Sequence, residues 1–487
     1  MKLKLSAALL ALLMCLSLLV ISACGGGGGS SSPDGAGDTA ADTASAETAA
    51  ETTTDIYANL PTGDLGGREM RIINQLYTWA ITQIDSEGID GEIINDEIFN
   101  RNRKLEDKLN FTFKVTDDSG DVKAKVKTSV QAGDGAYDLM FTGAFRVAPS
   151  INEGLFTDLN TIDTINLDNV WWDQTTRGQY TLNNKLYWMH GSMQLMIYEG
   201  LWTMMFNKQI VEDFALDNLY DLVVDGKWTY ERMTEMMKAV SEDLNGNGSH
   251  DFGDRFGIVT HTGSVFPFLH GLGEGVVKLG ADGVPALAET DEKFVGITDA
   301  LKSFYSDKEI CGLEPVIKAG GGDMYSYFSN DLTLFLVEVM GRVRDIRQMD
   351  SDFGLVPYPK YDEAQEFHIG YISPDTSALF WPVTNTGYED TGIFLENFGA
   401  SSYETVRPAY YDVTLQGKRL RDNESEQMLD YIYGHIQCEY GFMFRWAGID
   451  GVFKSMIADN KETVSTFDSV RSAVEGAIAK TMEYYDS

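Results

Sequence analysis

The segment 70–143 constrains the fold most, because strand and helix patterns alternate along it at the spacing of a parallel sheet. Apolar runs over 70–77 and 137–143 predict buried strands. Between them, Asn95 is a candidate N-cap for a helix, and alternating apolar and polar residues over 111–115 predict a further strand. Strand, helix and strand in this order predict an α/β fold with a mainly parallel sheet flanked by helices.

A second set of α/β patterns follows. Thr229 is a favourable N-cap, and the helix after it carries apolar residues at helical spacing, namely Met233, Met236, Met237 and Val240. Further helices are predicted over 396–420 and 425–442, and strands over 185–190, 198–207, 256–261, 332–339 and 353–356. A chain of 487 residues has room for two or three domains, so each set can form its own core.

The N-terminal residues predict export and lipidation. Lys2 and Lys4 precede an uncharged stretch over 5–23, which is followed by Cys24 and a glycine. This order is typical of a signal peptide, and the small residues before Cys24 resemble the bacterial lipobox. An uncleaved transmembrane anchor is the alternative, because the uncharged stretch could nearly span a bilayer. Residues 25–54 contain almost no large apolar side chain, so we predict a flexible tether there.

The charge and the cysteines limit the function classes. A formal net charge of −36 would repel phosphate backbones and anionic headgroups, which argues against nucleic-acid binding and favours a neutral or cationic ligand. Cys15 leaves with the signal peptide, so Cys311 and Cys438 remain as thiols beside the lipidated Cys24. These two could form a disulfide or stay as buried thiols, and the sequence supports both equally.

One short acidic segment, residues 243–254, predicts a calcium site. Its oxygen-bearing residues and its central glycine match the spacing of an EF-hand loop, although a shorter aspartate stands where that loop usually has glutamate. The bound ion would clamp the loop and would activate no water. A metal-free turn is the alternative. The candidate ligands are Asp243, Asn245, Asn247, Ser249, Asp251 and Asp254.

Catalytic motifs are absent from the sequence. There is no H-E-x-x-H zinc motif, G-x-S-x-G nucleophile elbow, P-loop or G-x-G-x-x-G fingerprint. The six histidines show no metal-ligand spacing. We therefore predict that the protein is not an enzyme. A surface glycan hydrolase is an alternative, because its carboxylate pair would not be recognisable from sequence, and so is a sensor that presents its ligand to a membrane kinase.

Aromatic residues gather near the ends of predicted strands. A flat ring can stack on the apolar face of a sugar, while polar side chains meet the hydroxyl edge, so these residues favour a carbohydrate ligand. Each ring taken alone is more often core packing. The residues are Tyr77, Trp79, Phe145, Tyr198, Trp202, Trp381 and Trp446.

Several phrases of the sequence, in this order, resemble the extracellular solute-binding proteins of bacterial ABC importers, in particular sugar-binding family 1. They are Tyr137-Asp138-Leu139-Met140 with Gly154-Leu155-Phe156-Thr157-Asp158-Leu159, then Met205-Phe206-Asn207-Lys208 with Gly226-Lys227-Trp228-Thr229, and finally Phe353-Gly354-Leu355-Val356-Pro357-Tyr358-Pro359-Lys360. The resemblance runs from residue 68 to about 450. It implies a type II periplasmic-binding-protein-like fold with two α/β lobes, a ligand in the cleft between them and hinge closure.

The resemblance also implies boundaries, site residues and partners. Lobe 1 would comprise 55–180 plus about 322–365, and lobe 2 would comprise 181–321 plus about 366–487. The family places ligand contacts on loops after the lobe strands, which points to Tyr77, Trp79, Phe145, Tyr198, Trp202, Glu338 and Trp446. We expect a monomer, lipid-anchored at the cell surface, that hands its ligand to an ABC permease. A peptide or another polar metabolite is the alternative ligand.

Overall fold

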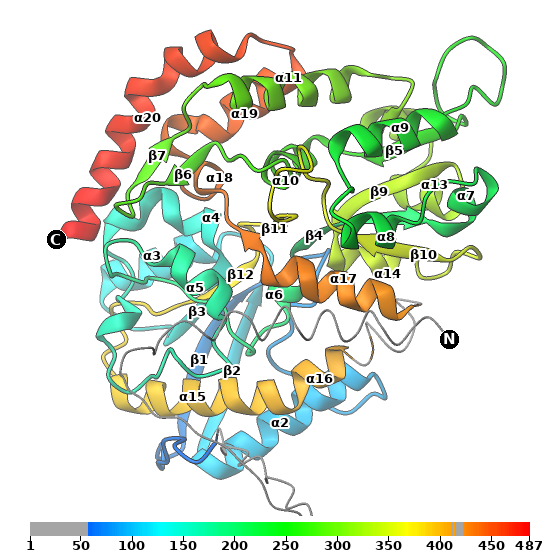
Figure 1. Ribbon diagram of the computed structural model, residues 1–487. Coiled ribbons are helices and arrows are strands. Elements are labelled where there is room, and N and C mark those ends of the chain that lie inside the picture. The colour runs from blue at the N-terminus through cyan, green and yellow to red at the C-terminus, as the bar shows by residue number, and fades with distance from the viewer. Residues whose placement is uncertain (1–56, 412, 414–421) are drawn as a thin grey trace, which may run out of the picture. The chain divides into compact units, whose positions relative to one another are not determined.

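Two β-sheets organise the part of the chain that the computed structural model describes, namely residues 57–411, 413 and 422–487 (Figure 1). The predicted signal peptide, Cys24 and the tether over 25–54 lie outside the described residues, as does most of 412–421, the end of one predicted helix. Each helix within the described ranges is either too short or too polar to span a lipid bilayer.

The first sheet has four strands in the order β12-β3-β1-β2. As predicted, β1 runs parallel to β2 and β3, while β12 is antiparallel to β3. The strands are β1 (Arg68–Gln75), β2 (Phe111–Asp118), β3 (Leu139–Gly143) and β12 (Ser377–Phe380). Helix α2 (Ile93–Leu109) packs on β2 and against α15 (Tyr388–Glu404), and α3 (Val122–Ala132) packs on β3 (Figure 1).

The second sheet has seven strands. Its order is β13-β11-β4-β9-β5-β8, and β10 pairs with β4. β5 is parallel to β8 and β9, whereas β4 is antiparallel to β9, β10 and β11. The strands are β4 (Leu201–Asn207), β5 (Phe256–Thr260), β8 (Cys311–Leu313), β9 (Thr333–Val339), β10 (Phe353–Val356), β11 (Gly370–Ile372) and β13 (Ile436–Gln437).

Strand pairing divides the chain differently from the predicted lobe boundaries. β9 and β10 fall within 322–365, which was expected to join the lobe of β1, but they pair with β5 and β4. β12 falls within 366–487, yet it pairs with β3 of the first sheet. A local apolar pattern shows that a strand exists, whereas its partner is chosen by contacts with distant segments, so sequence alone could not assign these strands.

Helices cover the second sheet and extend beyond it. The predicted helix after Thr229 is confirmed as α9 (Tyr230–Val240): the Thr229 hydroxyl accepts the Arg232 N–H, and the methionine stripe is buried against β5 and β9. The strand predicted over 185–190 is not formed, and this segment makes only two isolated bridges, Lys185 with Leu182 and Met189 with Leu379. A hairpin of β6 (Val277–Leu279) and β7 (Pro285–Leu287) forms a third, small sheet.

The remaining helices follow in chain order. They are α4 (Ala144–Val147), α5 (Gln174–Tyr180), α6 (Met196–Glu199), α7 (Lys208–Asp213), α8 (Leu219–Val224), α10 (Val265–Gly271), α11 (Glu292–Ser306), α12 (Glu314–Ala319), α13 (Met324–Ser329), α14 (Val343–Ile346), α16 (Val406–Tyr411), α17 (Asn423–Gly434), α18 (Tyr440–Phe444), α19 (Ile449–Ala458) and α20 (Thr463–Asp486). α11, α19 and α20 pack against one another (Figure 1).

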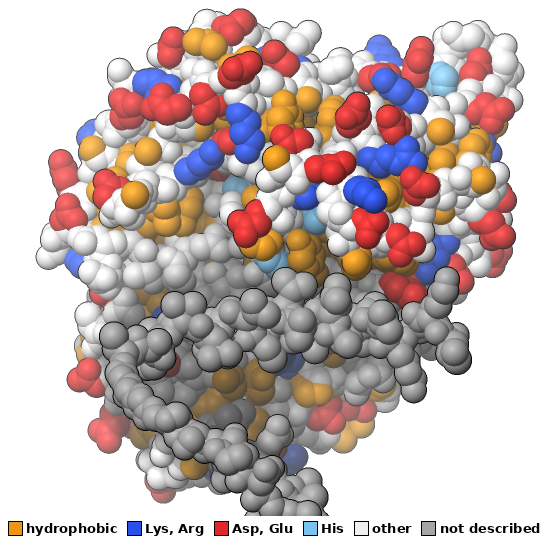
Figure 2. Space-filling model, in the orientation of Figure 1, with side chains coloured by type: hydrophobic (Ala, Val, Ile, Leu, Met, Phe, Trp, Pro, Cys, Tyr) orange, Lys and Arg blue, Asp and Glu red, His pale blue; other side chains and the backbone are white. Residues whose placement is uncertain are grey.

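The surface reflects the acidic composition. The chain has 74 acidic and 38 basic residues, and Figure 2 shows acidic side chains spread over the visible face with basic side chains between them. Many of the basic side chains bond a carboxylate, as Arg232 does with both Asp217 and Glu235. Exposed pairs of this kind add little stability, so the fold is held together mainly by its apolar core, which is continuous through both sheets.

Candidate functional site

The first part of the candidate site is the edge where β1 and β3 end. Tyr77 and Trp79 follow β1, and their rings meet edge to face with centroids 5.4 Å apart. Phe145 and Arg146 follow β3 on α4. The Tyr77 hydroxyl accepts a hydrogen bond from the Gly143 N–H at 3.0 Å. Because parallel strands end at the same edge, three of the predicted rings are brought together here.

A charged pair joins these rings. Arg146 Nε lies 3.3 Å from Asp375 Oδ1, and the guanidinium lies 4.8 Å from the centroid of the Phe145 ring. Burial raises the pKa of Asp375 to about 6, against the opposing effect of Arg146. Burial also raises the pKa of Tyr77, so its hydroxyl stays protonated at neutral pH and can donate a hydrogen bond.

The second part is the edge where β5 and β9 end and β4 begins. Glu338 is only 7% exposed here. Its Oε1 accepts the Tyr325 O–H at 3.3 Å and lies 3.3 Å from His261 Nε2, while Oε2 accepts the Val339 N–H at 2.8 Å. His261 Nδ1 accepts the Gly263 N–H, so the proton of the neutral ring lies on Nε2 and faces Glu338. These contacts fix the carboxylate.

Trp202 adds a donor to this second edge. Its ring lies 5.4 Å from His261, centroid to centroid, and its indole N–H is buried without a hydrogen-bond partner among the described residues. An unsatisfied buried donor costs about 1–3 kcal/mol, and an oxygen atom from a ligand or a water molecule would remove that cost. Trp202 therefore suits a site for an oxygen-rich molecule.

Two contacts show that the edges lie against each other. Arg344 Nη2, from α14, donates to the Thr78 carbonyl at 2.6 Å. Gly341 approaches the loop after β1 so closely that a Cβ there would lie 2.4 Å from the Trp79 carbonyl oxygen and 2.8 Å from Glu199 Oε2. Only glycine permits this approach. The rings that follow β1 therefore face the edge that holds Glu338.

Rings from α18 and α10 complete the contact. Phe442, on α18, has its ring centroid 5.9 Å from that of Phe145 and stacks on Phe266 of α10 at 5.2 Å. Phe145 and Phe442 are both half-buried. The aromatic surface thus continues from the first sheet across to helices that pack with the second.

Two of the predicted ligand residues belong to other clusters. Tyr198 stacks on Tyr410 and Tyr433, with centroids 5.7 and 5.6 Å away, in a packing cluster of α6, α16 and α17. Trp446 stacks on Phe444 at 4.4 Å, and its indole N–H donates to Thr481 of α20. Both rings therefore have packing partners outside the two edges.

Trp381 is also packed away from the two edges. It is fully buried, its indole N–H donates to the Asn385 carbonyl at 2.9 Å, and its ring stacks on Tyr388. Trp381 was among the rings that favoured a carbohydrate ligand in the sequence, but these contacts are those of local packing.

Several residues of the two edges were missed by sequence reasoning. Arg146 follows a predicted strand directly, so its position was an available signal. Asp375 and His261 stand beside strands as well, but single polar residues near strand ends are too common to select. Tyr325 and Phe442 come from helices, and nothing local marks them. The missed residues are Arg146, His261, Tyr325, Asp375 and Phe442.

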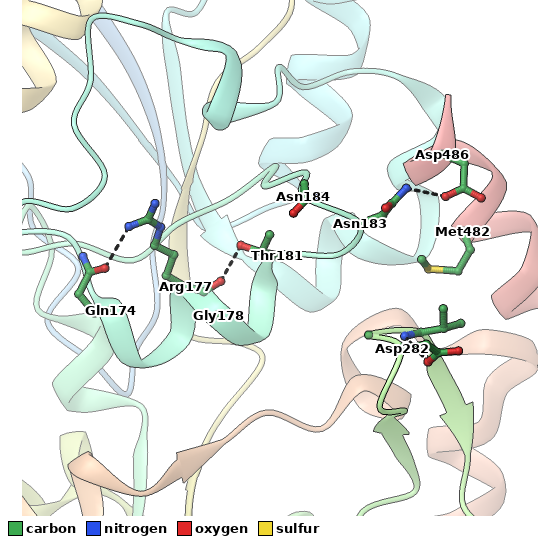
Figure 3. Close-up of a pocket in the computed structure, with 11 residues that line it drawn as sticks. Gln174, Arg177, Gly178, Thr181, Asn183, Asn184, Asp282, Met482 and Asp486 are labelled. Atoms are coloured by element: carbon green, nitrogen blue, oxygen red, sulfur yellow. Dashed lines mark hydrogen bonds between the residues drawn. The ribbon is translucent and has the colours of Figure 1, made fainter. Parts of the chain in front are cut away.

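A separate cavity of about 720 Å³ opens between α5, the β6–β7 hairpin and the end of α20 (Figure 3). Most of the residues that line it are polar, and most of their polar groups already have partners. Arg177 bonds Gln174 and Asp168, while Asn183 Nδ2 donates to Asp486 at 2.6 Å. No aromatic ring lines it, and no predicted site residue reaches it.

The acidic loop folds as a series of tight turns. Asp243, Asn245 and Asn247 each accept backbone N–H groups two to five residues ahead, and Gly246 and Gly248 adopt positive φ angles. The carboxylate, amide and carbonyl oxygens of this turn series suit a hard cation such as calcium.

The side chain of Asp254 stabilises the loop from its buried side. It is fully buried, and its oxygens accept the N–H groups of Leu244, Asn245 and Asp251. Among the described residues, no three His, Cys, Asp or Glu side chains are grouped to hold a metal. An ion at this loop would therefore need amide and carbonyl oxygens in addition to its few carboxylates, and calcium binding stays a prediction.

The two remaining cysteines are free thiols. Cys311 lies on β8 and Cys438 follows β13, and both are buried. Burial raises the pKa of both thiols, that of Cys438 to about 12. Of the two alternatives that the sequence left open, the structure shows the pair of buried thiols.

The comparison with protein families supports the resemblance seen in the sequence. Residues 85–267 match the sequence model of the family described as bacterial extracellular solute-binding protein. The resemblance to solute-binding proteins is thus confirmed. No curated protein has a significantly similar sequence.

Solved structures share the fold at low sequence identity. The ABC substrate-binding protein Lmo0181 from Listeria monocytogenes, in complex with cycloalternan, is 11% identical, with a TM-score of 0.52 over 86% of this chain and 99% of that chain. The sugar-binding protein MalE from Xanthomonas citri is 11% identical, with a TM-score of 0.58 over 86% and 99%. UgpB from Mycobacterium tuberculosis, in complex with glycerophosphocholine, is 12% identical, with a TM-score of 0.54 over 79% and 95%. The predicted type II periplasmic-binding-protein-like fold is confirmed.

Proposed function

We propose that this chain, which resembles extracellular solute-binding proteins in sequence and shares their fold, captures a sugar or oligosaccharide and delivers it to an ABC import permease. The ligand would lie between the two sheet edges, in contact with Tyr77, Trp79 and Phe145 on one side and with Trp202 and Glu338 on the other. No bond of the ligand would be made or broken.

The observation that carries this proposal is the pairing of half-buried rings with fixed polar groups across the two edges. A pyranose has apolar faces, which suit Trp79 and Phe145, and a rim of hydroxyl groups, which need acceptors and donors. Glu338 supplies a fixed acceptor and Trp202 an unpaired donor. The neighbouring structures named for sugars make carbohydrate the first ligand class to test.

Closure of the two edges would provide the binding step. A ligand that touches both edges favours the state in which they meet, and it shifts the balance by its preferential affinity for that state. The contacts of Gly341 with Trp79 and of Arg344 with Thr78 are those that closure would form.

The expected location and partners follow from the N-terminal sequence together with the family. We propose that Cys24 is lipidated, that the tether over 25–54 spaces the folded part from the membrane, and that a monomer docks on the permease. The named ABC substrate-binding neighbours support the permease partner.

A ligand panel tests the proposal. The melting temperature of the purified protein is measured with neutral and acidic mono- and oligosaccharides, short peptides and glycerophosphodiesters, and the sugars are analysed afterwards for breakdown. Binding to the native state raises stability by RT ln(1 + [L]/Kd), so a micromolar ligand at millimolar concentration gives a clear shift. A shift with intact glycan supports the proposal. A response only to peptides or only to glycerophosphodiesters would contradict it; the phosphodiesters are included because the UgpB structure contains glycerophosphocholine. Release of glycan fragments would also contradict it.

A further inference from the structure

Lys454, on α19, is a cation without a polar partner beside the candidate site. Its side chain is half-buried, and its Nζ lies 4.5 Å from the ring centroid of Phe442 and 5.3 Å from that of Phe266. It forms no hydrogen bond or ion pair with any residue that the structure describes. Burial lowers the pKa of Lys454, as expected for an ammonium group removed from water.

The other cations along this surface are neutralised. Arg146 faces Asp375 at 3.3 Å, and Arg342 bonds Asp345 at 3.1 Å. The acidic group nearest Lys454 along its helix is Asp450, one turn earlier, and its Oδ2 already accepts from Arg445 Nε at 3.1 Å. Asp450 attracts Lys454 electrostatically but forms no direct ion pair with it, so among the described residues the ammonium group of Lys454 has no bonded carboxylate.

Lys454 is connected to the proposed sugar site by a row of rings. Its ammonium group lies over Phe442, the Phe442 ring neighbours that of Phe145, and Phe145 follows β3 next to Tyr77. A sugar that contacts Phe442 would have Nζ as a near neighbour, because Nζ lies 4.5 Å from the centroid of that ring. Cation–ring contacts alone replace only part of the hydration that a lysine loses on burial.

We propose that the natural ligand is an acidic sugar, of the uronic acid class, whose carboxylate binds Lys454. This inference rests on the proposed carbohydrate function and narrows it. It also departs from the expectation, drawn from the net charge of −36, of a neutral or cationic ligand. The overall charge describes the surface, whereas the charge that meets the ligand is set locally, and here it is an unpaired ammonium group. One ammonium group is enough to bind one carboxylate, and the two parallel hydrogen bonds that an arginine would offer are not required.

The test compares matched ligands on matched variants by titration calorimetry. Galacturonate oligomers are compared with their carboxyl-reduced neutral counterparts on the parent protein and on Lys454→Met, Lys454→Arg and Lys461→Met. Lys461 is exposed and bonds Asp459, so its replacement removes the same charge outside the site. We expect the parent and Lys461→Met to bind the acidic oligomer at least tenfold more tightly than the neutral one. Lys454→Met should lose that preference with its affinity for the neutral oligomer unchanged, and Lys454→Arg should keep most of it.

Three results would overturn the inference. Equal affinity of the parent for both oligomers, or tighter binding of the neutral one, would refute the acidic ligand while the carbohydrate function stands. An equal loss for both oligomers in Lys454→Met would show a structural role only, and melting temperatures of the variants identify that case. No binding of any carbohydrate would overturn the proposed function and this inference together.

Discussion

The two sheet edges of the candidate site are built in different ways. The edge of the second sheet carries Glu338 on a strand, and three donors fix its carboxylate in a buried position. The edge of the first sheet carries Tyr77 and Trp79 on the loop after β1, where both rings are half-buried. One edge therefore presents polar groups set by the sheet, and the other presents apolar faces set by a loop.

This difference indicates that the two edges contribute to binding in different ways. Strand-held polar groups lose little entropy when they bind, so they can select the arrangement of hydroxyl groups. Under the proposed function, rings on a loop would contribute contact area and close over the ligand, and affinity would then depend on how well the loop meets the second edge. Variants that change one edge at a time should separate these two contributions.

Blocking the approach of the two edges should cost the most. In Gly341→Ala, the new Cβ would lie 2.4 Å from the Trp79 carbonyl oxygen. Overpacking of this kind costs about 1–3 kcal/mol, and the part due to the Trp79 carbonyl applies only when the two edges meet, so ligand affinity should fall by up to about 100-fold. Calorimetry measures the affinity, and solution scattering reports whether the ligand still compacts the protein. Gly476→Ala, at a glycine with open space around it, is the control. Unchanged affinity would mean that this contact is not part of binding.

Removing one ring from the loop should have a smaller effect. Trp79→Ala deletes a stacking face and should weaken ligand binding by about tenfold, since aromatic contacts are worth about 0.5–1.5 kcal/mol beyond their buried area. Trp79→Phe keeps a ring and should recover most of the affinity. Equal affinity of the alanine variant and the parent would remove Trp79 from the site, provided that melting curves show both proteins folded.

The charged pair beneath the rings should give a pH-dependent stability effect of about 1 kcal/mol. The native pKa of Asp375, about 6, lies above its ordinary value of 3.8, so the native state binds this proton more tightly than the unfolded state. The destabilisation by this carboxylate is full above pH 6 and disappears as the pH falls towards 4. Asp375→Asn should therefore be more stable than the parent at pH 7.5 and equal to it near pH 4, as measured by denaturant unfolding. A constant difference across this range would contradict the pKa assignment.

The smallest expected effect is a change in melting temperature on calcium binding to the loop 243–254. This loop leads into β5, and His261 follows the end of β5. If calcium binds residues 243–254, millimolar calcium should raise the melting temperature by about 2–5 °C relative to chelator, because the ion binds only the native loop. Asp243→Ala should abolish the shift, and Asp225→Ala, an exposed acidic residue outside the loop, should keep it. An unchanged melting temperature of the parent protein would favour the metal-free turn. The second edge would then be stabilised by protein contacts alone.

Local sequence patterns predicted the elements well and the site in part. The strands β1 to β3 and the methionine face of α9 follow from periodicity, because a buried face repeats with the period of its element. Tyr77, Trp79, Phe145, Trp202 and Glu338 stand at strand ends, so they could be found before their partners were known. Trp446 looked the same in sequence, but its partner Thr481 lies on α20, far along the chain. Which sheet β9, β10 and β12 join depends on similar long-range contacts.

The buried thiols have a practical consequence for measuring closure. Reaction with maleimide dyes requires the thiolate, and Cys311 and Cys438 are both buried with raised pKa values, so they should label slowly. Cysteines introduced at exposed Lys114, on β2, and Glu235, on α9, would label first, one beside each sheet. Energy transfer between the two dyes could then follow the distance between the sheets as ligand is added, with both native cysteines left in place.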